Sequence, residues 1–380
     1  MVDFDAAILP GVKQPLEVRR TRIAKLERGD VLVRIMASGL CHTDLEVIEG
    51  SLAYPMPIIL GHEGAGVVEA VGEDVSAVKA GDHVVCSWNP HCGHCFYCER
   101  DQPILCEPFT YNQPRGHLLD GKSRLTCEAG KGHQFSTVSK VHHFSVVSSH
   151  AQYAVVPESG AIAVPKEIPF DRACLIGCGV MTGVGAAVRL AKVEAGASVA
   201  VIGCGAVGLN ALQGARLANA GTIIAIDRAK GRQNLSRVFG ADLTAGEPGD
   251  DVVAFVKQHT GGRGADYVFE AAGSADGFRL GAEIVRPGGH LVFLGKVNVN
   301  QDVAFRWGAL MGEKKITRSS YGGARPRRDF PWLARAYLDG KLKLDELITA
   351  RLPLGRINEG FEAMRRGEGI RTVVLPWDSA

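Results

Sequence analysis

The chain has 380 residues, more than one ordinary domain of roughly 100–200 residues holds, so we expect two or three domains. Hydrophobic residues make up 46% and charged residues 22% of the sequence, a composition that indicates a globular protein and excludes a disordered chain. The 43 basic and 41 acidic residues leave a net charge of +2. A dedicated nucleic-acid binder is disfavoured, because it needs a basic excess to hold phosphates.

The order of the predicted elements indicates an α/β protein with an inserted domain. The first ~180 residues contain short strands and many turns, with strands expected at 31–37, 66–71 and 84–88. Strands then alternate with helices at 206–219 and 232–239, the strands being expected at 198–202, 222–226, 266–269 and 290–294. Short strands near 242 and at 315–319 would complete a doubly wound, parallel, six-stranded sheet. Helices at 330–338 and 357–366 and a strand at 371–375 follow.

This alternation of strands and helices predicts a nucleotide-binding domain at residues 180–320. The flanks, residues 1–179 and 321–380, are predicted to rejoin as one discontinuous, β-rich domain. The uncharged run at 195–215 is long enough to cross a membrane, but it contains five glycines and a strand–turn–helix pattern, so we expect no membrane span. The first ten residues have no basic segment before an apolar stretch, and ten cysteines without an export signal favour metal binding over disulfides. Cytoplasm is the expected location.

The sharpest motif is a cysteine lobe with the spacing C-x2-C-x2-C-x7-C, formed by Cys92, Cys95, Cys98 and Cys106. Four thiolates from one short segment complete a tetrahedral zinc shell with no open position, which is typical of a structural site. Two alternatives are buried thiols and an iron–sulfur cluster, although the last gap departs from the bacterial ferredoxin spacing. His91 and His94 are interpreted as surface residues of the lobe.

A second set of metal-binding residue types is dispersed: Cys41, His62 and, much later, Cys178. Each alone is more often a packed core residue than a ligand. Together they offer two thiolates and one imidazole, which leave the fourth position of a zinc ion open for water or substrate, as catalytic zinc sites require.

A dinucleotide-binding motif runs from Gly203 through Gly205 to Gly208. It follows an apolar strand and opens a helix, so its glycines allow a tight turn, close approach of a pyrophosphate, and packing of helix on strand. Asp227 follows the next strand at the spacing expected for binding the adenosine ribose, and its charge favours NAD over NADP. Arg228 and Arg232 could partly offset that repulsion, and a helix cap is the alternative role for Asp227.

These motifs together resemble one family. The stretches C-H-T-D at 41–44, G-H-E-G-A-G-x5-G-x2-V at 61–75, the cysteine lobe, and G-C-G at 177–179 are similar to the zinc-containing medium-chain alcohol dehydrogenases. Residues 116–124 and 340–371 resemble the class III-like bacterial branch. The resemblance implies a GroES-like, β-rich catalytic domain and a Rossmann domain, which would bind NAD and two zinc ions.

The resemblance also assigns roles to residues. Cys41, His62 and Cys178 would ligate the catalytic zinc, with Glu63 as a transient ligand, and the cysteine lobe would hold the structural zinc. Asp44 would orient the His62 ring. Thr43 would take the proton from the alcohol, and Glu46 stands where many relatives have a relaying histidine. The further cofactor contacts implied are His42, Thr182, Val207, Gly295 and Arg371.

The substrate pocket of relatives is lined at the positions of Leu52, Trp88, Tyr111, Lys296 and Ser320. Trp88 favours a flat or aromatic alcohol, with a core aromatic as the alternative, and Lys296 could attract an acidic group or point to solvent. We therefore expect reversible oxidation of a primary alcohol, aromatic or allylic, to an aldehyde.

Two other functions are compatible with part of the sequence. An S-hydroxymethyl thiol (formaldehyde) dehydrogenase is the first, but its characteristic arginine is replaced here by Thr110, with Arg115 as a substitute. A non-catalytic zinc-binding interaction module is the second. A homodimer is expected, with a tetramer as the alternative, because relatives with a long segment between Cys106 and Cys178 tend to be dimers; its contact is predicted at an edge strand near 297–303. No membrane or nucleic-acid partner is expected.

Overall fold

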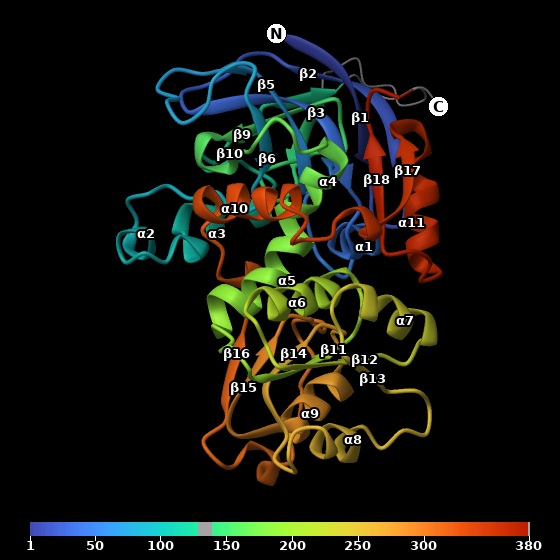
Figure 1. The fold of residues 1–380 in the computed structure, drawn as a ribbon. Coiled ribbons are helices and arrows are strands. Elements are labelled where there is room, and N and C mark those ends of the chain that lie inside the picture. Colours follow the sequence, from blue (N-terminus) through green and yellow to red (C-terminus); the bar gives the residue numbers. More distant parts are fainter. Residues whose placement is uncertain (128–138, 379–380) are drawn as a thin grey trace. The chain divides into compact units, whose positions relative to one another are not determined.

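The structure is a computed structural model that describes residues 1–127 and 139–378. It divides into two compact units, the first formed by Met1–Cys178 and Arg325–Ala380, the second by Gly179–Ala324. The N- and C-terminal parts of the chain thus share one unit (Figure 1). Residues 128–138, part of the long segment on which the dimer prediction depends, lie outside the described residues.

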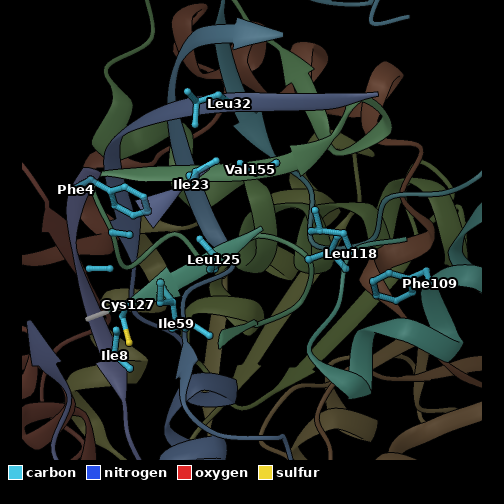
Figure 2. Packing of buried hydrophobic residues seen from close by; sticks show 14 of the residues in the cluster. Phe4, Ile8, Ile23, Leu32, Ile59, Phe109, Leu118, Leu125, Cys127 and Val155 are labelled. Carbon is cyan, nitrogen blue, oxygen red and sulfur yellow. The ribbon is translucent and has the colours of Figure 1, made fainter. Parts of the chain in front are cut away.

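A small closed barrel forms one layer of the first unit. Its strands follow one another in the order β1, β2, β7, β8 and β4, with bounds Val2–Leu9, Glu17–Ile23, Leu125–Cys127, Ser139–His143 and Ile58–Ile59. All pairs are antiparallel except β4 with β8. Figure 2 shows the apolar cluster that packs on these strands, among its residues Phe4, Ile8, Ile23 and Leu125.

A larger sheet in the same unit sets the positions of the metal-binding residues. Its path runs β10, β6, β5, β3, β18 and β17, and β9 also pairs with β3; the bounds are Ala161–Ala163, His83–Cys86, Glu63–Val71, Asp30–Gly39, Arg371–Leu375, Ile348–Pro353 and Tyr153–Pro157. Strands β3 and β5 are antiparallel, with Gly39 opposite Glu63. This register brings the residues just after β3 beside those just before β5.

The helices of the first unit lie between and after these strands: α1 (His42–Glu49), α2 (Phe96–Glu99), α3 (Glu107–Asn112), α4 (Phe170–Leu175), α10 (Pro326–Leu338) and α11 (Ile357–Arg365). Helix α1 ends at Gly50, which has a φ of 82°, the left-handed conformation that glycine adopts at helix C-termini without strain. Helix α10 begins with Pro326, whose missing N–H is not needed at that position. It starts four residues before the predicted segment 330–338.

The second unit is a parallel six-stranded sheet in the order β13, β12, β11, β14, β15 and β16, with bounds Leu243–Ala245, Thr222–Ile226, Ser198–Ile202, Ala265–Glu270, Val285–Phe293 and Lys315–Arg318. Its helices are α5 (Met181–Gly185), α6 (Ala206–Leu217), α7 (Lys230–Val238), α8 (Val252–Gln258) and α9 (Ala275–Ile284). The central strands β11 and β12 are nearly continuous apolar runs, as expected for a parallel sheet covered on both faces. The predicted doubly wound sheet is confirmed.

The prediction of an edge strand near 297–303 is wrong. Those residues form a turn, in which the Gln301 N–H donates to the Asn298 carbonyl, and the last strand of the sheet is β16. The polar residues Asn298, Asn300, Gln301 and Asp302 favour a turn over a strand.

The uncharged run at 195–215 is divided between strand β11 and helix α6. A different segment, residues 170–191, is long and apolar enough to cross a membrane by length and composition alone. Of its apolar window, 72% is buried inside the fold, as is usual for a core helix of a globular protein.

Replacing Phe4 by alanine should lower the free energy of unfolding by about 3–5 kcal/mol, because the fully buried ring would leave a cavity in the barrel. The matched control is Val18→Ala on the paired strand β2, whose side chain is 45% exposed; it should change stability by less than about 0.5 kcal/mol. Urea denaturation of the two variants checks this, and equal shifts of the midpoint would contradict the described packing.

Candidate metal and cofactor sites

Four potential ligands meet in the first unit. One atom each from Cys41, His62, Glu63 and Cys178 lies within 4.8 Å of the others. Cys41 caps the N-terminus of α1, His62 directly precedes β5, and Cys178 stands in a π-helical turn at Ile176–Val180. The predicted convergence of distant residues is thus present, and the set of two thiols, an imidazole and a carboxylate fits a zinc ion.

Asp44 links the two short segments that carry the first ligands. Its fully buried carboxylate accepts hydrogen bonds from the Cys41 N–H and the Gly61 N–H, both at 3.0 Å. Its Oδ1 also lies 3.4 Å from Nδ1 of His62. The arrangement leaves Nε2 of His62 available for a metal and matches the support expected for a metal-bound imidazole.

The charges of this group depend on one another. Burial alone would lower the pKa of His62, but the Asp44 carboxylate and the Cys41 sulfur raise that pKa well above its ordinary value. A hydrogen bond from Cys178 keeps the pKa of the Cys41 thiol well below its usual range, and raises that of Cys178. The Cys41 and Cys178 sulfurs thus share a proton. A divalent cation that binds both thiolates would take the place of that proton.

Glu63 forms a buried ion pair that the sequence did not indicate. Its carboxylate is fully buried and lies 3.3 Å from the Arg371 guanidinium, which also donates to the Leu40 carbonyl at 3.2 Å. Burial raises the pKa of Glu63 to about 7. Strand β18 pairs with β3, so Arg371 reaches this site; its predicted contact with a pyrophosphate stays a prediction.

The cysteine lobe forms a second cluster of ligands. The sulfurs of Cys92, Cys95, Cys98 and Cys106 lie within 4.8 Å of one another, and those of Cys92 and Cys98 are 4.0 Å apart. Sulfurs about 2.3 Å from a tetrahedral zinc would stand roughly 3.8 Å apart, so the lobe fits the ion. The remaining cysteines, Cys86, Cys127, Cys174 and Cys204, are buried.

Helix α1 presents the predicted proton-transfer residues on one face. His42 is exposed and Thr43 and Glu46 are half-buried, whereas Asp44 and Leu45 are buried, a pattern with the helical period. The Cys41 thiol approaches the Thr43 hydroxyl at 3.9 Å. The hydroxyl therefore lies beside the ligand set, while Glu46 lies one turn along the helix.

In the second unit, the glycine motif has the geometry of a phosphate-binding turn. Gly203 has a φ of 88°, and a Cβ there would meet the Ala272 N–H. A Cβ on Gly208 would meet the Gly203 carbonyl, whereas a Cβ on Gly205 would have no atom of the described residues within 4 Å apart from its own chain neighbours. The open space at Gly205, at the N-terminus of the twelve-residue helix α6, fits a pyrophosphate.

Asp227 is tied to this turn. Its Oδ2 accepts from the Cys204 N–H at 2.8 Å and its Oδ1 from the Ala229 N–H at 2.9 Å, so the carboxylate stands at the end of β12 with a fixed orientation. Arg228 is exposed and Arg232 half-buried. The other predicted cofactor contacts of this unit lie at the start of α5 and α6 and at the carboxyl end of β15: Thr182, Val207 and Gly295.

The predicted pocket residues belong to both units. Leu52 packs on an apolar cluster of the first unit, and Trp88 packs on two such clusters with its ring 6.4 Å from that of Phe109. Tyr111 is 62% exposed and lies under the Arg115 guanidinium. Lys296 and Ser320 belong to the second unit. That all five line one pocket stays a prediction.

Sequence reasoning missed several buried residues around the ligand set. The Phe144 ring packs edge-on against the His62 ring, with centroids 5.5 Å apart. His150, Ser38 and Ser149 form a buried polar cluster. None of these residues has a spacing typical of ligands, so only their burial in the fold reveals them.

Comparisons with known proteins agree with this geometry. Residues 27–166 match the family model of the alcohol dehydrogenase GroES-like domain, and residues 206–338 that of the zinc-binding dehydrogenases. The chain is 37% identical to alcohol dehydrogenase class-3 of Myxine glutinosa over 98% of both chains. It is 36% identical to a probable S-(hydroxymethyl)glutathione dehydrogenase of Schizosaccharomyces pombe, over 97% of this chain and 96% of that one.

Among solved structures, benzyl alcohol dehydrogenase of Acinetobacter calcoaceticus superposes with a TM-score of 0.91, at 31% identity over 99% of both chains. The chain belongs to the zinc-containing medium-chain alcohol dehydrogenase family. It is an NAD-dependent zinc oxidoreductase that uses two zinc ions, with a GroES-like domain and a Rossmann domain. The alternative of a non-catalytic zinc module is therefore wrong.

The two metal clusters should be separable by mutation. Native mass spectrometry should find two zinc ions per wild-type chain and one in each of Cys178→Ser and Cys98→Ser, because each variant removes a thiolate from only one cluster. Cys178→Ser should fold with its activity abolished, whereas Cys98→Ser should lose stability, since a closed structural site contributes folding energy. Cys127→Ser, a buried thiol outside both clusters, should keep two ions; two ions in Cys178→Ser would contradict the ligand assignment.

Proposed function

We propose that the protein catalyses the reversible oxidation of a primary aromatic or allylic alcohol to its aldehyde, with NAD as hydride acceptor. The observation that carries this proposal is the cluster of Cys41, His62, Glu63 and Cys178. Because the Glu63 carboxylate is paired with Arg371, the two thiolates and the imidazole would leave the fourth position of a zinc ion open for a substrate oxygen. When bound there, zinc supplies a Lewis acid that lowers the pKa of an alcohol hydroxyl.

The chain's own residues then transfer the proton and bind the coenzyme. The Thr43 hydroxyl, beside the Cys41 sulfur, accepts the proton of the alcohol and donates its own toward the coenzyme ribose. Glu46, one turn further along α1, is the final acceptor of the proton. A carboxylate can take the place of the histidine of relatives, because proton transfer requires only an acceptor within hydrogen-bond reach. His42 and Arg371 would bind the pyrophosphate from the first unit.

Two features support a flat apolar substrate. Trp88 is a half-buried aromatic residue of the first unit, and Leu52 is a partly buried apolar residue there. Aromatic rings pack well against planar groups. The similarity to a benzyl alcohol dehydrogenase over 99% of the chain supports the same substrate class.

Oxidation of an S-hydroxymethyl thiol is the second candidate, supported by the relative named for that activity. Against it, Thr110 stands where the characteristic arginine is expected. Arg115 is the residue that could take the place of this arginine. Its guanidinium carbon lies 3.7 Å from the centroid of the Tyr111 ring, and its guanidinium donates to the Tyr111 carbonyl. Its guanidinium is therefore engaged with Tyr111.

A screen of NAD-linked oxidation distinguishes the candidates. We expect kcat/KM for benzyl and cinnamyl alcohol to exceed that for ethanol by at least about a hundredfold, since burying a ring adds roughly 3 kcal/mol of binding. Highest kcat/KM for S-hydroxymethylglutathione would establish the second candidate instead. Absence of NADH formation with every alcohol, from a preparation containing both zinc ions, would refute the proposed function.

The Asp227 carboxylate should set the preference for NAD. Asp227→Ser should raise kcat/KM for NADP by about tenfold or more, because the negative charge that repels a 2′-phosphate is removed. Asp250→Ser is the matched control: Asp250 also accepts two backbone N–H groups, those of Gly246 and Glu247, but lies outside the motif. Steady-state kinetics with both coenzymes checks this, and an unchanged NADP/NAD ratio in Asp227→Ser would contradict it.

For assembly and location we propose a cytoplasmic homodimer. Strand β16 is one of the two edges of the parallel sheet, and large apolar side chains stand exposed on the segment around it: Val299 (89%), Trp307 (77%), Met311 and Ile316. Exposed apolar surface of this kind is typical of an interface. None of the ten cysteines, all of which lie in the described residues, forms a disulfide, which suits a reducing compartment.

A further inference from the structure

A buried histidine outside the ligand set faces the carboxylate that supports it. His150 is fully buried, and its Nε2 lies 3.9 Å from Oδ2 of Asp44. This Nε2 has no hydrogen-bond partner in the part of the chain that the structure describes. Its Nδ1 lies 2.9 Å from the Ser38 hydroxyl, which in turn lies 2.7 Å from the Ser149 hydroxyl. The four side chains form a row that ends at Asp44, which reaches His62.

The backbone beside His150 is fixed to the segment that carries His62. The Ser149 N–H donates to the Gly61 carbonyl and the His150 N–H to the Leu60 carbonyl, both at 3.0 Å. Gly61 has a φ of 91°, and a Cβ on it would stand 2.6 Å from Nδ1 of His150. The imidazole is therefore packed directly against the residue before the metal ligand, with little freedom to move.

The charges decide which ring nitrogen carries the proton. Burial lowers the pKa of His150 to about 4, so the ring is neutral near pH 7 and holds one N–H. If the proton were on Nδ1, the lone pair of Nε2 would face the buried Asp44 carboxylate, and two acceptors would oppose each other in a low-dielectric environment. With the proton on Nε2, the N–H dipole points at the carboxylate.

That choice fixes the direction of every other hydrogen bond in the row. Nδ1 must then accept from the Ser38 hydroxyl, and because a hydroxyl has one proton to donate, the Ser38 oxygen accepts from Ser149. The proton order thus runs from Ser149 through Ser38 and His150 toward Asp44. At 3.9 Å the last contact is an electrostatic one, too long for a hydrogen bond. Oδ2 of Asp44 accepts its hydrogen bond from the Cys41 N–H.

We propose that His150 is a positioning residue for the catalytic metal centre: its Nε2–H compensates and orients the buried Asp44 carboxylate, which holds the His62 ring and the Cys41 and Gly61 backbones in place. A buried carboxylate is costly unless its charge is compensated, and partners beyond the ligands of a metal affect its affinity. The proposal rests on the assignment of the catalytic metal ligands. Neither the motifs nor the comparisons assign a role to His150.

Release of zinc to a competing chelator tests this without any activity measurement. In His150→Phe, which keeps a planar ring but has no N–H, we expect release of the catalytic zinc to be faster by about tenfold, the lower end of the effect of outer partners on metal affinity. The zinc of the cysteine lobe is the internal control and should be released at the wild-type rate. That rate is measured separately in Cys178→Ser, which keeps only the zinc of the lobe.

Rescue separates the role of the N–H from packing. In His150→Gln the amide NH₂ can reach toward Asp44, so its catalytic zinc should be retained much better than in His150→Phe. Equal losses from the two variants would show that only the shape of the residue matters and would overturn the proposal, as would wild-type release from His150→Phe. Ser38→Ala, which removes the donor to Nδ1, should accelerate release in the same direction.

Three further outcomes separate the role of His150 from the metal assignment. Should His150→Phe fail to fold, Ser38→Ala decides: faster release of the catalytic zinc supports the proposal and an unchanged rate overturns it. A wild-type chain that holds only the zinc of the cysteine lobe would refute the metal assignment itself. Two zinc ions with unchanged release from all variants would refute the role of His150 alone.

Discussion

Two thiols and one imidazole can share a metal only if strands β3 and β5 keep their register, because Cys41 follows one strand and His62 precedes the other. The pairing of Gly39 with Glu63 sets that register, and a shift of one residue would turn every side chain of a strand to the opposite face. Asp44 then joins the two strand ends through hydrogen bonds to backbone on both sides. The open position for substrate depends on this junction.

The same region concentrates buried charge. Glu63 and Arg371 form one buried pair, and Asp44 is compensated by N–H groups and by the adjacent imidazoles. Isolated ionised groups would be too costly in such an interior, so each depends on its neighbours. A divalent cation bound by two thiolates adds the positive charge that this acidic and sulfur-rich cluster needs, which is why metal binding and local structure are coupled here.

Much of the fold could be predicted from the sequence, because local patterns encode it: apolar runs such as Ser198–Ile202 and the glycine turn after it are visible without any long-range contact. The metal clusters were predictable from residue chemistry and the family resemblance. The Glu63–Arg371 pair and the position of His150 were not, since they arise from contacts between residues far apart in sequence. The turn at 297–303 was missed because valines at both ends outweighed the polar residues between them.

The central claim is that Cys41, His62 and Cys178 hold one zinc ion while leaving a position open. Anomalous diffraction from a crystal at the zinc absorption edge tests it most directly. The account predicts a peak about 2.0–2.3 Å from these three ligand atoms, besides one in the cysteine lobe, and a fourth position filled by water or substrate. No peak among the three residues, or a shell closed by a fourth protein ligand in the presence of coenzyme and substrate, would contradict it.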